Sequence, residues 1–204
     1  MNTIKTNTPI ESVPYGETVI PQNRLEFLTQ KCREVLQKVP GNVLEIGVYK
    51  GGTIIGLAKQ VQDVCPSCKV YGVDTFSGHP YTDGHPVHPE GKYADVSREE
   101  LEETFKQEGL AIQLYKGKIE EIFDSLNLEN VSFVHVDCDL YIPIKFCAEK
   151  ITPVINKGGM IYFDYYGHEH CPGATKAVDE VFSKDQIHEV SLEDGTCWSC
   201  YIHV

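Results

Sequence analysis

Amphipathic segments and short apolar runs alternate along this chain. Apolar residues recur at helical spacing over 23–39, and this segment ends before Pro40 and Gly41. The later apolar runs have the length of buried strands, and segments of helical period separate them. The pattern predicts strands over 42–48, 69–74, 111–116, 131–137 and 160–164, and helices over 53–64, 97–108, 119–126, 143–155 and 173–182. This order is typical of a mostly parallel sheet with helices on both faces.

Two more apolar runs, 187–191 and 197–203, predict a closing hairpin that adds an antiparallel edge to the sheet. The predicted fold class is therefore α/β, a Rossmann-like doubly wound sheet that is mostly parallel. The chain has 204 residues and no long polar linker, so we expect a single domain over 21–204. Residues 1–20 are polar and contain several prolines, which predicts a flexible N-terminal arm.

The net charge narrows the classes of partner. Lys and Arg total 18 against 30 Asp and Glu, which gives −12, and the eight His cannot make the sum positive. Nucleic-acid binding is disfavoured because neutralising phosphates needs a positive surface. No apolar run approaches the ~20 residues of a membrane span, and the first residues lack the apolar core of a signal peptide. We therefore expect a soluble cytoplasmic protein without a membrane partner, and a homodimer is one assembly that fits.

Eight cysteines are spread along the chain, and we expect them to be reduced thiols. Two pairs, Cys65 with Cys68 and Cys197 with Cys200, have the internal spacing of zinc ligands. About 130 residues separate the two pairs. Unrelated thiols are favoured over a shared zinc site, which stays open as the second interpretation.

Acidic residues gather where the predicted strands end. In an open α/β sheet, ligands bind beyond the carboxyl ends of the strands, at the point where the strand order reverses. Acids spread by chance would fall at both ends of the strands, so this bias predicts a functional site. The residues in question are Glu45, Asp74, Asp137, Asp139 and Asp164.

The loop after the first strand contains Glu45, Gly47, Gly51 and Gly52, a spacing that differs from the G-x-G-x-x-G of dinucleotide sites. Hydride-transfer chemistry is therefore disfavoured, and an acid inside the turn would repel a pyrophosphate. A ligand with a positive sulfonium and an amino group suits that carboxylate, while Asp74 is placed to accept both hydroxyls of a ribose. These features favour S-adenosylmethionine. The alternative is a tight turn beside a surface acid.

Several motifs together resemble those of the macrocin O-methyltransferase (TylF-like) family. They include VLEIGVYKGGT at 43–53, VDTFSG at 73–78, VHVDCDLY at 134–141 and FDYYG at 163–167, and shorter matches lie at 116–117, 158–159 and 173–180. The similarity covers about 21–182. It implies a class I S-adenosylmethionine-dependent enzyme, and several members methylate sugar hydroxyls on natural products with the help of a divalent metal.

The resemblance also implies roles for individual positions. Glu45 and Gly47 would lie against the methionine part of the cofactor, and Asp74 would hold its ribose. The remaining cofactor-binding positions implied by the matched motifs are Tyr49, Gly51, Thr53, Thr75, Phe76, Gly117 and Asp137.

Asp137 and Asp139 would face the transferred methyl group, as metal ligand and general base, with Asp164 as a second metal ligand. For Asp139, capping the helix that follows is an equal alternative. The family has two consecutive acids where this chain has Asp164 and then Tyr165, and a phenol is a poor ligand for a hard cation. We therefore expect a weakened Mg²⁺ site on Asp137, Asp139 and Asp164, and activity that Mg²⁺ stimulates.

The loop over 77–91 carries His79, His85 and His88 among three prolines. Its place after Asp74 predicts a lid or an acceptor-binding wall, in which one histidine helps to deprotonate the acceptor. A transition-metal site and an ordinary proline-stiffened loop are the alternatives. His135, inside the fourth strand, is expected to be a core histidine.

The sequence thus predicts an S-adenosylmethionine-dependent O-methyltransferase that acts on a hydroxyl of a small acceptor, a sugar or a glycosylated metabolite. A carboxylate suits this chemistry because the acceptor oxygen must lose its proton as it attacks. The competing hypothesis is a catalytically silent binding protein that keeps the methyltransferase fold.

Overall fold

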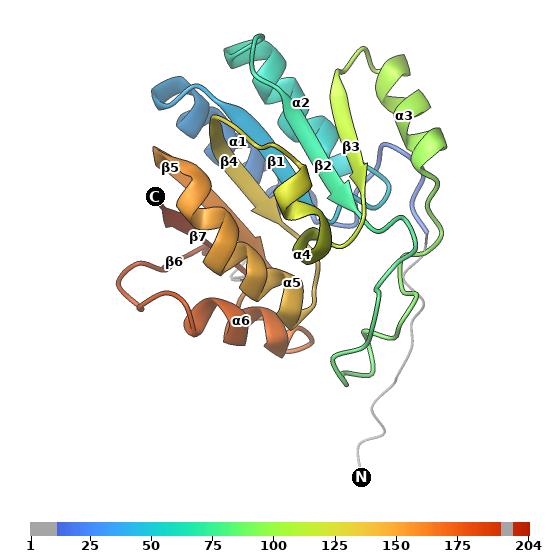
Figure 1. Cartoon of the computed structure of the whole chain (residues 1–204), viewed down its shortest axis with the longest axis vertical. Helices are drawn as coiled ribbons and strands as arrows, with labels where there is room; N and C mark the ends of the chain where they lie inside the picture. Colours follow the sequence, from blue (N-terminus) through green and yellow to red (C-terminus); the bar gives the residue numbers. More distant parts are fainter. Residues whose placement is uncertain (1–11, 193–197) are drawn as a thin grey trace.

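A computed structural model describes residues 12–192 and 198–204, which form one twisted sheet between two layers of helices (Figure 1). The strand order is β3-β2-β1-β4-β5-β7-β6. The first five strands in chain order are parallel, β7 is antiparallel to β5, and β6 at the edge is antiparallel to β7. The predicted fold class is confirmed. The strands are β1 Asn42–Ile46, β2 Val70–Asp74, β3 Ile112–Lys116, β4 Val131–Val136, β5 Ile155–Asp164, β6 His188–Glu189 and β7 Ser199–His203.

Helices cover both faces because side chains alternate along each strand. In β4, Phe133 packs into the apolar cluster shared with the first three helices, and Val134 packs into the cluster on the other face. One layer contains α1 Gln22–Lys38, α2 Gly52–Val64 and α3 Arg98–Gln107, and the other contains α4 Ile119–Ile122, α5 Tyr141–Phe146 and α6 Pro172–Asp179. Among the described residues, no helix is both long and apolar enough to cross a membrane.

The largest departure from the predicted elements lies between α5 and β5. The helix begins at Tyr141 and continues through a π-helical turn and a 3-10 turn, and β5 then starts at Ile155. The Gly158-Gly159 pair therefore lies inside a strand, not after a helix. A Cβ at Gly159 would lie 2.6 Å from the carbonyl oxygen of Ser132, so glycine permits the close approach of β5 to β4.

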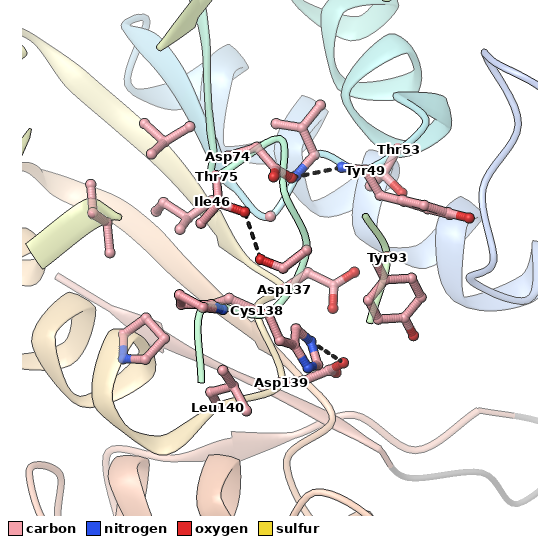
Figure 2. Close-up of a pocket in the computed structure, with 18 of the residues that line it drawn as sticks. Ile46, Tyr49, Thr53, Asp74, Thr75, Tyr93, Asp137, Cys138, Asp139 and Leu140 are labelled. Carbon is pink, nitrogen blue, oxygen red and sulfur yellow. Dashed lines mark hydrogen bonds and ion pairs between the residues drawn. The ribbon is translucent and has the colours of Figure 1, made fainter. Parts of the chain in front are cut away.

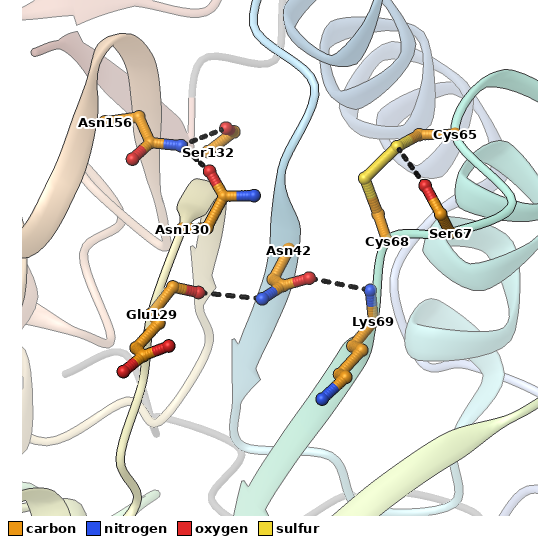
Figure 3. The surroundings of a disulfide bond; sticks show 9 residues. All are labelled: Asn42, Cys65, Ser67, Cys68, Lys69, Glu129, Asn130, Ser132 and Asn156. Atoms are coloured by element: carbon orange, nitrogen blue, oxygen red, sulfur yellow. Dashed lines mark hydrogen bonds between the residues drawn. A yellow bond between two sulfur atoms is a disulfide. The ribbon is translucent and has the colours of Figure 1, made fainter.

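Cys65 and Cys68 form a disulfide, so the prediction of reduced thiols is wrong for this pair (Figure 3). A turn after α2, in which the Cys68 amide donates to the Cys65 carbonyl, brings the two Cα atoms to 5.4 Å. Three strands separate β2, which follows this turn, from β7, which contains Cys200. A zinc site shared by the two pairs is therefore not formed by the three described cysteines, and Cys197 lies outside the described residues.

The part of the N-terminal segment that the structure describes, from residue 12 on, contacts the rest of the domain. The Gly16 amide donates to the Lys50 carbonyl at 2.8 Å, and the Ser97 amide donates to the Tyr15 hydroxyl at 2.7 Å. Ile20 is buried. These contacts place the segment beside the loop that follows β1, at the carboxyl edge of the sheet.

Candidate active site

A pocket opens at the carboxyl ends of β1, β2 and β4 (Figure 2). The figure shows Asp74 and Asp139 on opposite sides of it, with Asp137 between them. The described N-terminal segment, the loop after β2 and the segment after β5 complete the walls through Thr18, His79 and Tyr165.

Most of the predicted site residues line this pocket. Those that do are Gly47, Tyr49, Thr53, Asp74, Thr75, Gly117, Asp137 and Asp139. Four others do not, namely Glu45, Gly51, Phe76 and Asp164. These four residues are buried in the packed interior. The contacts of the two acids, Glu45 and Asp164, are described below.

Gly47 brings the loop after β1 against the loop after β4. Its φ is 89°, and a Cβ there would lie 1.8 Å from the carbonyl oxygen of Asp137. The backbones stay together because the Asp137 amide donates to the Ile46 carbonyl at 2.8 Å. Only glycine allows this approach, so the position fixes where the Asp137 side chain starts.

Asp74 organises the same loop from the side of β2. Its Oδ2 accepts the amides of Val48 and Tyr49 at 2.8 and 2.9 Å, and its Oδ1 accepts the amide of Phe76 at 2.8 Å. Carboxylates that accept several backbone N–H groups form strong, charge-assisted bonds. Asp74 therefore holds the glycine loop in shape, a role that the prediction of ribose binding did not include.

Glu45 lies in the interior. It pairs in register with His135 on β4, and a 2.7 Å hydrogen bond joins its Oε1 to the Nδ1 of that histidine. Burial, together with the nearby Asp137 and Asp74 charges, raises the pKa of Glu45 well above its usual value, and burial lowers the pKa of His135 to about 3. The expected contact of Glu45 with the methionine part of a cofactor is not supported, because the strand register directs its side chain inward. His135 is the core histidine that was expected.

Asp139 stands among three nitrogen-bearing side chains. His79 Nε2 lies 3.2 Å from its Oδ2, His88 Nδ1 lies at 3.5 Å and Lys92 Nζ at 3.7 Å. Burial alone would raise the pKa of Asp139, but hydrogen bonds from the two histidines hold it below its usual range. Asp139 also has a φ of 58°, and this left-handed residue turns the chain sharply after β4.

Among the described residues, no donor is hydrogen-bonded to the Asp137 carboxylate, and its environment acts in the opposite direction although the Arg24 and Lys92 charges oppose this. Burial raises the pKa of its carboxyl well above the usual value, and the charges of Asp164 and Asp139 raise it further. The two acids therefore differ in character although one residue separates them. Asp139 stays ionised, while Asp137 holds a proton more readily.

The histidine loop forms a wall of the pocket. His79 lines the pocket and is buried, and its Nδ1 has no hydrogen-bond partner among the described residues. His88 is also buried and contacts the His170 carbonyl through Nε2 at 2.8 Å. The transition-metal alternative for this loop stays open, because His79, His88 and Asp139 offer ligand atoms within 4.8 Å of one another, whereas His85 is not part of this group.

Arg24 is the site residue that sequence reasoning missed. It belongs to α1 and is buried, and its Nη2 donates to Asp164 Oδ2 at 3.1 Å. Its guanidinium carbon lies 4.8 Å from the ring centroid of Tyr165. A signal existed, because Arg24 precedes Leu28 and Cys32 at intervals of four on the apolar stripe of the helix. Burial raises the pKa of Asp164 to about 6, although the Arg24 charge opposes this.

These contacts decide how well the residues fit Mg²⁺. Asp164 is paired with Arg24, Tyr165 has no carboxylate, and Asp139 is surrounded by nitrogen donors. His135, Asp137 and Asp164 do offer ligand atoms within 4.8 Å of one another, and Asp164 Oδ1 has no hydrogen-bond partner among the described residues. Mg²⁺ prefers oxygen ligands to imidazole. The misfit lies in the fixed positive charges, because a divalent ion on Asp164 or Asp139 would lie beside Arg24 or Lys92.

The comparison with protein families decides the relationship. The model of the macrocin-O-methyltransferase (TylF) family matches residues 5–198. The chain belongs to the macrocin-O-methyltransferase (TylF) family. The predicted resemblance, carried by motifs on β1, β2, β4 and β5, is thereby confirmed.

Individual O-methyltransferases are similar to most of the chain. Demethyldecarbamoylnovobiocin O-methyltransferase from Streptomyces niveus is 27% identical in an alignment 203 residues long, and the alignment covers 90% of this chain and 75% of the relative. A 4'-O-methyltransferase from Streptomyces olivaceus, whose named substrate is a dimethoxyrhamnosyl tetracenomycin, is 25% identical over 89% of this chain and 74% of its own length. The solved structure of the O-methyltransferase NovP superposes with a TM-score of 0.76 and 25% identity, over 91% of this chain and 81% of NovP.

Proposed function

We propose that this TylF-family protein transfers a methyl group from S-adenosylmethionine to a hydroxyl of a small acceptor, a sugar or a glycosylated metabolite. The observation that carries the proposal is the pocket in which Gly47, Asp74 and Asp137 meet at the switch point of the sheet. The relative named for 4'-O-methylation of a rhamnosyl tetracenomycin supports the acceptor class.

The pocket is suited to a cationic cofactor. In the described part of the chain, five acids line it, Glu17, Asp74, Glu120, Asp137 and Asp139, against two lysines, Lys50 and Lys118. A phosphate would meet this negative charge, whereas a sulfonium and an amino group gain from it. Gly47 has no side chain, and a Cβ there would collide with the Asp137 backbone. The absence of a side chain also lets a ligand approach the main chain closely.

S-adenosylmethionine would supply an electrophilic methyl group whose sulfur leaves as a neutral thioether when the acceptor oxygen forms its new bond to carbon. The protein must therefore remove one proton from the acceptor. Asp139 is a weak base because its histidine partners stabilise its ionised form. His79 instead offers Nδ1 for the proton, while Nε2 faces Asp139 at 3.2 Å. In this scheme Asp139 orients the imidazole and stabilises it once it is charged.

The predicted Asp139 base thus becomes the partner of a histidine in the proposed reaction. Magnesium assistance is left out of the proposal because Arg24 and Lys92 approach two of the three expected ligands. The cytoplasmic location and the homodimer stay predictions.

Catalytic silence is the second candidate, favoured by the single observation that Tyr165 replaces an acid of the family pattern. Calorimetry with S-adenosylmethionine, with NAD as the control ligand, tests the cofactor. Release of S-adenosylhomocysteine in the presence of a panel of sugars, glycosides and phenols tests the reaction. Binding together with turnover supports the enzyme, whereas binding without turnover on any acceptor supports the silent protein. Absence of binding overturns both.

A further inference from the structure

We propose that Arg24 supplies at Asp164 the positive charge that a divalent metal ion would supply, so that the site works without the expected Mg²⁺. The proposal rests on the proposed methyltransferase function. It makes Arg24 a positioning residue, which acts through Asp164 and Tyr165 and does not line the pocket itself.

The ion pair is built into the interior. The side chains of Arg24 and Asp164 are 4% and 1% exposed, and the Nη2 to Oδ2 distance is 3.1 Å. A buried carboxylate needs a compensating charge, and a guanidinium held by helix α1 supplies one permanently. A metal ion bound to the same carboxylate would lie beside this fixed cation and be repelled by it.

Tyr165 supports the arrangement from the pocket side. Its ring lies under the guanidinium, with 4.8 Å between the guanidinium carbon and the ring centroid, which is a cation–π distance. A second carboxylate at this position would favour a divalent ion, whereas a phenol ring favours a guanidinium. Arg24 and Tyr165 therefore act together, since one brings a positive charge to Asp164 and the other offers a phenol in place of a carboxylate ligand.

Asp139 also has a cation of the chain beside it where a metal ion could lie. Lys92 Nζ lies 3.7 Å from Asp139 Oδ2, and His79 and His88 contact the same oxygen. Each of these two acids thus has a cation from the chain itself. Asp139 and Asp164 would repel the negative charge that develops on the acceptor oxygen during the reaction. The neighbouring cations neutralise these acids and so reduce the repulsion.

The test uses the full chain and four variants. Arg24→Met removes the charge, Arg24→Lys keeps it, and Arg24→Met combined with Tyr165→Asp restores the acid of the family pattern. Arg33→Met is the matched control, because Arg33 belongs to the same helix and pairs with the exposed Asp63. Thermal unfolding is recorded with EDTA and with 0 to about 10 mM MgCl₂, and S-adenosylhomocysteine release is measured with the same additions.

For the parent chain, Arg24→Lys and Arg33→Met, we expect no change in Tm or turnover between EDTA and Mg²⁺. Arg24→Met should lose about tenfold or more of its turnover, and Mg²⁺ should recover part of it. Mg²⁺ should also raise the Tm of Arg24→Met by about 3 °C, and that of the double variant by more. Loss of packing alone would not respond to Mg²⁺.

Saturable stabilisation of the parent chain by Mg²⁺, or loss of its turnover in EDTA, overturns the proposal. So does a folded double variant that Mg²⁺ does not stabilise, because Arg24 would then not be what replaces the ion. If Arg24→Met does not fold, the response of the parent chain and of Arg24→Lys to Mg²⁺ and EDTA still upholds or overturns the metal independence of the site. Tm measured with Mg²⁺ does not depend on turnover, so failure of the methyltransferase proposal would appear separately, as absent S-adenosylmethionine binding.

Discussion

Replacing Asp74 by alanine should loosen the loop that carries the proposed cofactor site. The carboxylate accepts three backbone amides, from Val48, Tyr49 and Phe76. Fully buried bonds to a charged acceptor are worth roughly 1.5 to 3 kcal/mol each. Asp74 is only half-buried, so water can satisfy part of what is lost, and we take about 1 kcal/mol per bond. The free energy of unfolding should fall by about 3 kcal/mol, a decrease in Tm of roughly 6 to 12 °C for a chain of this size.

Two matched variants sharpen this test. Asp74→Asn keeps one acceptor oxygen and turns an amide N–H₂ towards the remaining donors, so its Tm should lie between those of the parent chain and Asp74→Ala. Asp83→Ala removes a carboxylate that accepts a single backbone amide, from His85 at 3.2 Å in an exposed turn, and should change Tm little. Differential scanning calorimetry gives all three values.

Calorimetric titration with S-adenosylmethionine tests whether the same carboxylate also binds the cofactor. If Asp74 also accepts ribose hydroxyls, Asp74→Ala should weaken binding by about 2 to 3 kcal/mol, roughly 30- to 150-fold in Kd. A folded Asp74→Ala protein with the Tm and affinity of the parent would refute the reasoning, because neither the loop nor the ribose would then depend on this carboxylate.

Three further predictions concern other parts of the chain. Asp137→Asn should lower turnover by about 100-fold and weaken S-adenosylmethionine binding much less, and an equal loss in both would mean that Asp137 only shapes the pocket. Because the pKa of His135 is lowered to about 3, its contribution to stability is present above pH 6.5 and is lost as the pH falls towards 3. Tm should therefore decrease less on acidification in His135→Gln than in the parent, and parallel curves would contradict this. Replacing Cys65 and Cys68 together by serine should cost at most about 2 kcal/mol in urea unfolding, because the closed loop is short, and should not alter cofactor binding.

The sequence alone determined the architecture and the edge of the sheet at which the site lies. Apolar runs and helical periods are local signals, and their alternation leaves few ways to build a sheet. Strand direction then places Asp74, Asp137 and Asp164 at one edge, whatever their later contacts. Where local signals conflicted with packing, packing decided the outcome, as at Gly159, which serves the approach of two strands and does not end a helix.

Only the tertiary structure decided which charges meet. Arg24 and Asp164 are 140 residues apart, Glu45 and His135 are 90 apart, and neither pair leaves a mark in local spacing. Strand register directs Glu45 inward, and the docking of α1 brings a guanidinium to the end of β5. The period of an element fixes the face on which a side chain lies, but the partner on that face depends on another element packed against it. For this reason the acids of the site could be located from the sequence, while the pairing of each acid with its cation could not.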